Sequence, residues 1–220
     1  MSRTPFDPTL YLVTDPALGR GRSLTGIVAE AVHGGVTLVQ LRDKAADGRA
    51  LLEQARALVA LLAPFGVPLI VNDRVDVAVA AGAAGCHVGQ SDLPAAEARA
   101  LLGPDAILGV SLDAVEQAEE IDAAVVDYVA HGPFAGTATK ADAGAAVGAA
   151  GIAQVRALTA LPLIAIGGLE AGNLGAAIGA GANGIAVVSA IMTAADPAAA
   201  SRALAGAIAT ARRDARGEGA

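Results

Sequence analysis

In "VQLRDK" (residues 39–44), a predicted buried strand ends in three large polar side chains. Gln40, Arg42 and Lys44 stand at every second position, and side chains two apart on a strand share a face. Upstream, the same face holds Val36 and Leu38, which are typical of a protein core. A buried face that becomes polar where its strand ends indicates a functional site at that end.

Similar short apolar runs recur along the chain, and between them lie segments with helical character. Helices are predicted over residues 47–63, 114–122 and 196–215, the last with Asp196 as N-cap and Pro197 at its first position. The eight strand-like runs are "LYLVTD" (10–15), "VTLVQLR" (36–42), "PLIVND" (68–73), "GCHVGQ" (85–90), "AILGVS" (106–111), "DYVAHG" (127–132), "PLIAIGG" (162–168) and "GIAVVS" (184–189).

Strands that alternate with helices predict right-handed βαβ units and a parallel sheet. Eight such units in 220 residues match the count of a (β/α)8 TIM barrel, an α/β fold. A doubly wound open sheet is the competing architecture, but it needs fewer strands and a glycine-rich turn after the first, which "TDPALGRG" matches poorly. We therefore predict one TIM-barrel domain over residues 1–220, with a frayed tail at about 216–220.

Composition narrows the class of protein. Hydrophobic residues make up 54% and charged residues 17% of the chain, which disfavours disorder. The net charge is −7 and no basic stripe alternates with aromatics, so we expect no nucleic-acid partner. The single cysteine, Cys86, excludes an intrachain disulfide framework. The start lacks a signal-like segment, and Pro64, Gly66 and Pro68 interrupt the longest apolar run, so a cytoplasmic protein without a membrane span is expected.

Polar residues follow several predicted strands, where TIM barrels hold their active sites. Arg42 and Lys44 form a candidate anion site after the second strand. Asn72 and Asp73 follow the third strand and Asp92 follows the fourth, although an ordinary helix cap would also explain each of them. Two carboxylates beside two cations favour a site for a magnesium-bound diphosphate.

Two further strand ends extend this candidate site. Ser111 ends the fifth strand and offers a hydroxyl to a phosphate. The glycine-rich stretch "GPFAGTATKADAG" (132–144) follows the sixth strand and contains Thr137, Thr139 and Lys140. It is either a plain surface loop or a lid that closes hydroxyls and an ammonium over an anion.

The last two strands predict a second anion site. "IGG" ends with Gly167 and Gly168, and the stretch "GANGIAVVSA" (181–190) contains Val188 and Ser189 at the end of the eighth strand. Loops after the seventh and eighth strands are the usual phosphate site of this fold, with backbone N–H groups directed at the anion. The mouth is therefore predicted to bind a diphosphate and a monophosphate together.

These motifs, in this order, resemble the thiamine phosphate synthase family along nearly the whole chain. The matching blocks are "VQLRDK", "LIVNDRVDVAVAAGAAGCHVGQSDLP", "LGVS", "DYVAHGPFAGTATKADAG", "IAIGG" and "GANGIAVVSAI". The resemblance implies a transferase that joins a hydroxymethylpyrimidine diphosphate to a thiazole phosphate, giving thiamine phosphate and diphosphate. It also implies that diphosphate departs first and that the thiazole nitrogen then attacks the pyrimidine cation.

The resemblance also implies roles for residues at matching positions. The contacts to the pyrimidine diphosphate would be Gln40, Arg42, Lys44, Asn72, Ser111 and Lys140, of which Arg42, Lys44, Ser111 and Lys140 would act in catalysis. The Mg²⁺ ligands would be Asp73 and Asp92. The contacts to the thiazole phosphate would be Thr137, Thr139, Gly168, Val188 and Ser189.

Three positions depart from the family pattern. Leu112 and Asp113 stand where the family usually has Thr-His, and His131 stands where it usually has glycine. The loop after "GPF" also lacks a proline that is common there. The first two departures leave the detail of the diphosphate pocket open. We expect a structural role for His131, and likewise for His33 and His87.

Three other functions compete with coupling. A thiazole tautomerase-like relative would bind thiazole phosphate without joining it to anything, and a regulatory relative would bind it without catalysis. Another phosphosugar barrel enzyme would share only "IGG" and "VVS". The diphosphate half of the site favours coupling, because the tautomerase-like and regulatory relatives do not need Asp73 and Asp92 beside Arg42, Lys44 and Lys140. The sequence leaves a homo-oligomer open.

Overall fold

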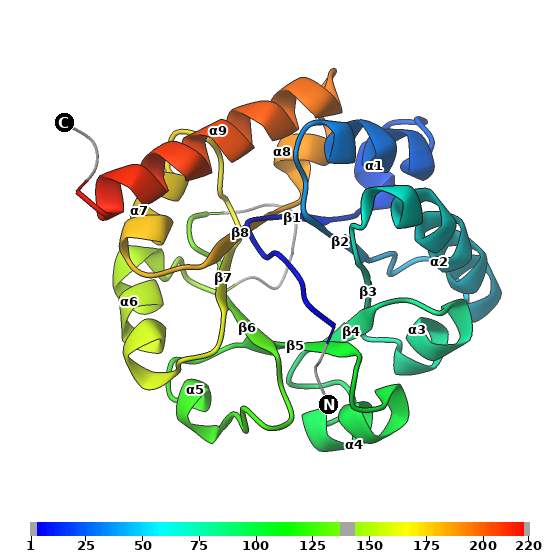
Figure 1. Ribbon diagram of the computed structural model, residues 1–220, viewed down its shortest axis with the longest axis horizontal. Helices are drawn as coiled ribbons and strands as arrows, with labels where there is room; N and C mark the ends of the chain where they lie inside the picture. The colour runs from blue at the N-terminus through cyan, green and yellow to red at the C-terminus, as the bar shows by residue number, and fades with distance from the viewer. Residues whose placement is uncertain (1–3, 137–143, 218–220) are drawn as a thin grey trace.

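The computed structural model describes residues 4–136 and 144–217. Eight parallel strands follow one another around a closed barrel in chain order, and the helices form a ring outside it (Figure 1). The strands are β1 (Leu10–Val13), β2 (Leu38–Leu41), β3 (Leu69–Asn72), β4 (Gly85–Val88), β5 (Ile107–Leu112), β6 (Tyr128–His131), β7 (Leu163–Ile166) and β8 (Gly184–Val187). The predicted TIM barrel is confirmed.

The helices between the strands vary in length. Two 3-10 helices are η1 (Pro16–Gly19) and η2 (Ala63–Phe65). The α-helices are α1 (Leu24–His33), α2 (Gly48–Leu62), α3 (Val75–Ala81), α4 (Ala95–Leu102), α5 (Gln117–Glu120), α6 (Gly148–Leu158), α7 (Leu174–Gly179), α8 (Ser189–Met192) and α9 (Pro197–Ala215).

The predicted boundaries hold best where a cap defines them. α9 begins at the predicted Pro197, because the Asp196 carboxylate accepts a hydrogen bond from the Ala199 N–H at 2.7 Å. The helix predicted over residues 114–122 is wrong in length, since α5 is one turn without a side-chain cap. Most strands end one or two residues earlier than predicted. In the predicted tail, the N–H groups of residues 216 and 217 still donate to carbonyls of the last turn of α9, and the rest lies outside the described residues.

The core has two parts, one inside the barrel and one between barrel and helices. Leu38 belongs to the inner cluster, together with Tyr11, Ile70 and Tyr128. Val36 belongs to the outer cluster, so the prediction that it shares a face with Leu38 is wrong. The reason is that Val36 lies before β2, where its N–H still bonds to a carbonyl of α1.

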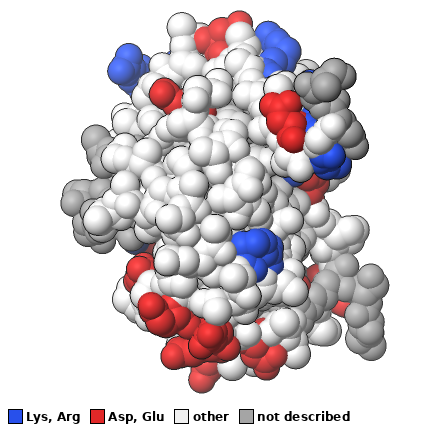
Figure 2. Space-filling model, turned by 90° about the vertical axis from the view of Figure 1, so that its left-hand side faces the viewer, with Lys and Arg blue, Asp and Glu red and all other residues white. Residues whose placement is uncertain are grey.

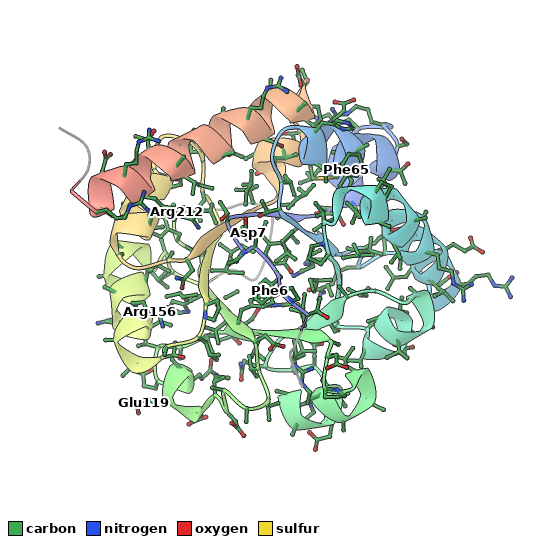
Figure 3. All side chains as sticks on the ribbon, in the orientation of Figure 1. Phe6, Asp7, Phe65, Glu119, Arg156 and Arg212 are labelled. Carbon is green, nitrogen blue, oxygen red and sulfur yellow. The ribbon has the colours of Figure 1, made fainter. Side chains whose placement is uncertain are left out.

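The segment before β1 crosses the end of the barrel that faces the viewer in Figure 1, and Phe6 lies near its centre in Figure 3. Phe6 packs on the ring of Tyr128 with centroids 5.5 Å apart. Thr4 anchors the segment through two hydrogen bonds to the Asp105 carbonyl. This segment covers the end of the barrel opposite the predicted site, where Phe6 contacts the Tyr128 ring inside the barrel.

The outer surface is weakly charged on the face shown in Figure 2. Acidic side chains gather at its lower edge, on the side of the molecule where Figure 3 labels Glu119 of α5, and the Lys and Arg side chains in view are few. Among the described residues, no helix is long and apolar enough to cross a membrane.

Candidate active site

Lys44 and Asp73 meet at the carboxyl ends of β2 and β3. The Lys44 ammonium lies 3.2 Å from a carboxylate oxygen of Asp73. Arg42, two residues before Lys44, is half-buried, and the Thr14 hydroxyl holds its backbone on both sides: it accepts from the Arg42 N–H at 2.9 Å and donates to the Arg42 carbonyl at 3.1 Å. Thr14 thus extends the pairing of β1 and β2 beyond the ends of the strands. No role for Thr14 was predicted from the sequence.

Asp73 occupies a strained turn rather than a helix cap. Its φ is 62°, which is left-handed and uncommon for a residue with a side chain. The Arg74 N–H bonds back to the Asn72 carbonyl at 2.7 Å, and the Asp73 N–H bonds to the His87 carbonyl at 2.8 Å. The N-cap of α3 is Arg74, without a side-chain bond, so the capping alternative for Asn72 and Asp73 is wrong. Strain of this kind is typical of functional sites.

Asp92 does not cap a helix either. Its carboxylate accepts a hydrogen bond from the Gly89 N–H at 2.7 Å, whereas α4 has Pro94 as its N-cap. Burial raises the pKa of Asp92, and the neighbouring Asp73 carboxyl, which interacts with it directly, raises it further. The two predicted metal ligands therefore lie together, from the ends of two different strands.

A pocket of about 190 Å³ adjoins this pair between the loops after β2 and β3. Lys44, Asn72 and Asp73 line it, together with Asp43 and Arg74. Predicted anion contacts and one predicted metal ligand thus share one hollow. Among the described residues, no group of three or more His, Cys, Asp or Glu side chains forms a metal cluster, so any ion here would need ligands from solvent or substrate.

Gln40 and Ser111 lie inside the barrel and are joined by a buried chain of hydrogen bonds. The Gln40 amide donates to the Tyr11 hydroxyl at 2.8 Å, and the Tyr11 and Tyr128 hydroxyls are 2.8 Å apart. The Tyr128 hydroxyl is 3.0 Å from His87 Nδ1, and His87 Nε2 is 2.8 Å from the Ser111 hydroxyl. Two predicted substrate contacts from opposite sides of the barrel are therefore connected.

His87 is the main residue that sequence reasoning missed, because it was assigned a purely structural role. It contacts Ser111 directly, and burial lowers its pKa to about 4, so the ring is neutral at physiological pH. A signal was present in the sequence. The chain has only two tyrosines, Tyr11 and Tyr128, and both stand in predicted buried strands, where a hydroxyl needs a polar partner.

The predicted monophosphate site lies at the ends of β7 and β8. Gly168 has a φ of 65°, and Val188 is the N-cap of α8, whose first residue is Ser189. Asn173 closes the turn after β7 by donating to the Gly168 carbonyl at 2.8 Å. Gly168 and Ser189 therefore end neighbouring strands, as predicted. Three other predicted residues lie outside the described residues: Thr137, Thr139 and Lys140.

Gly168 should tolerate no side chain. A Cβ atom there would lie 2.7 Å from the carbonyl oxygens of Ala135 and Gly136, in a backbone conformation that disfavours one. We expect Gly168→Ala to lower the free energy of unfolding by about 2 kcal/mol. Gly172→Ala is the matched control in the same turn, since a Cβ there meets nothing within 4 Å. Equal urea midpoints for the two variants would contradict this explanation.

The three departures from the family pattern lie away from the barrel interior. Leu112 is buried in the outer cluster, and Asp113 is exposed in a turn that the Gln117 side chain holds. His131 is 1% exposed, and its Nδ1 bonds to the Leu112 carbonyl at 3.0 Å. A structural role for His131 fits this placement, and none of the three side chains joins the chain from Gln40 to Ser111.

A family model and the sequences of known proteins identify the same family. The model of the family described as thiamine monophosphate synthase matches residues 10–191. The thiamine-phosphate synthase of Azorhizobium caulinodans is 56% identical over 209 residues, covering 95% of this chain and 99% of that protein. That of Xanthobacter autotrophicus is 59% identical, covering 94% of this chain and 99% of that protein.

A solved structure agrees with the sequences. The thiamine phosphate pyrophosphorylase from Pyrococcus furiosus superimposes with a TM-score of 0.85 at 32% identity, covering 93% of this chain and 97% of that chain. A 3-hexulose-6-phosphate synthase, at 20% identity and a TM-score of 0.64, shares the fold alone. The family match spans most of the barrel and both predicted halves of the site. The chain therefore belongs to the thiamine monophosphate synthase family.

Proposed function

We propose that the protein is a thiamine-phosphate synthase that joins a hydroxymethylpyrimidine diphosphate to a thiazole phosphate, releasing diphosphate. The observation that supports this most directly is the convergence of Lys44, Asn72, Asp73 and Asp92 at one side of the barrel mouth. A barrel that bound only thiazole phosphate would not need this half of the site, so tautomerase-like and regulatory functions are less well supported.

The pair of carboxylates fits a magnesium ion. Asp73 and Asp92 offer hard oxygen ligands and interact directly, so their ionised forms repel each other even with the Lys44 ammonium 3.2 Å from Asp73, and an ion bound by both would relieve that repulsion. Magnesium commonly takes one or two carboxylates and fills its other positions with water and substrate phosphates. When bound, the ion would neutralise the charge that develops on the departing diphosphate.

The remaining polar side chains would act on the substrates. Arg42, Lys44 and Lys140 supply positive charge to the diphosphate, while Gln40, Asn72 and Ser111 offer hydrogen bonds from the barrel ends. These groups favour loss of diphosphate before the thiazole nitrogen attacks, so no protein base is required. Thr137, Thr139, Gly168, Val188 and Ser189 would hold the thiazole phosphate for that attack.

A coupling assay tests the proposal. Purified protein is mixed with both substrates and Mg²⁺, and thiamine phosphate is measured after oxidation to its fluorescent product. Product that depends on both substrates and on Mg²⁺ is expected. If both ligands bind in calorimetry but no product forms, the protein is a relative that binds without coupling.

The monophosphate half can be tested separately with Ser189→Asp. A carboxylate at the first residue of α8 would repel the thiazole phosphate, so we expect its KM to rise about a hundredfold or more, with little change in affinity for the pyrimidine diphosphate. Ser189→Ala, which removes the hydroxyl without adding charge, serves as the control and should raise the KM only severalfold. Unchanged binding of thiazole phosphate by Ser189→Asp would place the monophosphate site elsewhere.

A further inference from the structure

The buried chain from Gln40 to Ser111 links residues of five strands inside the barrel: β2, β1, β6, β4 and β5. Tyr11 and Tyr128 are 1% and 0% exposed, so neither hydroxyl can turn to water. Asn72, His87, Gly109 and Tyr128 stand opposite one another in register on β3 to β6. The buried hydroxyls and the His87 ring cannot exchange their hydrogen bonds for bonds to water. Each proton along the chain must therefore point to an acceptor, so one donor fixes the direction of the bonds that follow.

Gly109 makes room for the central contact. A Cβ atom at this position would collide with the Tyr128 ring and would lie 2.5 Å from His87 Nδ1. The imidazole and the phenol ring stack across this gap with centroids 5.5 Å apart and 27° between their planes. Phe6 also packs on the Tyr128 ring, with centroids 5.5 Å apart and the planes tilted by 52°. The bond between His87 and Tyr128 therefore occupies a space built for it.

The direction of each hydrogen bond follows from the donor at one end. The Gln40 amide nitrogen can only donate, so the Tyr11 hydroxyl accepts from it and gives its own proton to Tyr128. Tyr128, having accepted, gives its proton to His87 Nδ1. In a neutral ring the remaining proton is then on Nε2, which donates to the Ser111 hydroxyl oxygen. The hydroxyl proton of Ser111 is left for a ligand at the mouth.

Two alternative proton orders conflict with these contacts, the first because it leaves a buried proton without a partner and the second because it reverses the Gln40 amide. A charged His87 would donate from both nitrogens, and Tyr128 would then accept from two neighbours with no partner for its own buried proton. The reverse order would require the Gln40 carbonyl oxygen to face Tyr11. Ser111 would then spend its proton on His87 and would turn only lone pairs toward an anion.

We propose that Tyr11 and Tyr128 are positioning residues that hold His87 in its Nε2-protonated form and thereby keep Ser111 as a hydrogen-bond donor toward the substrate anion. The identity of that anion, a diphosphate, rests on the proposed function. The order of protons within the barrel does not, because it follows from the contacts of the ligand-free protein.

The first test is the nitrogen spectrum of the histidine rings in the free, ¹⁵N-labelled protein. The chain has three histidines, and the signal of His87 is the one that disappears in His87→Gln. We expect Nε2 to show a bound proton and Nδ1 to show none. A proton on Nδ1, or on both nitrogens at neutral pH, would overturn the proposal. This result does not depend on whether the coupling assay succeeds.

The second test removes one hydroxyl. Tyr128→Phe keeps the ring that packs against Phe6 and His87 but removes the hydrogen bond to His87 Nδ1. We expect a mixture of His87 tautomers and a kcat/KM for the pyrimidine diphosphate about tenfold lower, with the KM for thiazole phosphate unchanged. Phe6→Leu disturbs the same ring without touching the hydrogen bonds, so it should leave the tautomer unchanged. If Tyr128→Phe also leaves the tautomer unchanged, Tyr128 only fills space.

Discussion

Replacing Asp73 with asparagine should lower the rate of magnesium-dependent coupling by about a hundredfold. The substitution removes one of two carboxylates at the proposed ion site while keeping the size of the side chain. Asparagine also tolerates the left-handed backbone of this position, where φ is 62°. The protein should therefore fold normally, so that a lower rate reports on the ion site. The measurement is the coupling rate as a function of Mg²⁺ concentration. The Mg²⁺ concentration that gives half of the maximal rate should be higher in Asp73→Asn than in the unmodified protein.

The matched control is Asp76→Asn, three positions further along. Asp76 pairs with Arg74 at 2.6 Å on the exposed start of α3, and its loss should leave the coupling rate unchanged. In the absence of Mg²⁺, Asp73→Asn should not lower the melting temperature. Burial and the Asp73 carboxyl both raise the pKa of Asp92, so the ionised pair costs stability at neutral pH. An unaltered magnesium titration would remove Asp73 from the ion site.

The barrel was predictable because its signal is local. Each strand is a short apolar run that a turn or helix interrupts, and counting eight runs was enough to identify a closed parallel sheet. The predicted placement of Lys44, Asp73 and Asp92 followed from one rule, that parallel strands end on the same side. The same rule could not say whether Asp73 caps a helix or faces Asp92, since that depends on the left-handed turn at Asp73.

The interior network was not predictable in the same way. A period of two tells which residues share a face, but not which residue of the next strand stands beside them. His87 gains its role because the register places Gly109 between it and Tyr128. The helix predicted over residues 114–122 shortened to one turn, α5, which has no side-chain cap and buries only Ala118.

A largely buried ion pair lies where β5 meets β6, and we expect Arg99→Met to show how much it contributes to stability. The Arg99 guanidinium lies 2.6 Å from a carboxylate oxygen of Asp127 that also accepts from the Leu108 N–H. It further donates to backbone carbonyls of residues 103, 106 and 125. Methionine keeps the apolar stem but leaves the Asp127 charge buried without its cation. We expect the free energy of unfolding to fall by about 3 to 5 kcal/mol, measured by urea denaturation.

Arg74→Met separates the effect of burial from that of the ion pair itself. Arg74 and Asp76 also meet at 2.6 Å, but their side chains are 44% and 66% exposed, against 13% and 8% for Arg99 and Asp127. Arg74→Met should therefore lower the free energy of unfolding by less than about 1 kcal/mol. Similar losses in both variants would mean that the buried pair adds nothing beyond its surface counterpart. A large loss only in Arg99→Met would show that this pair fixes β5 against β6, the two strands whose alignment places Ser111 and Tyr128 on either side of His87.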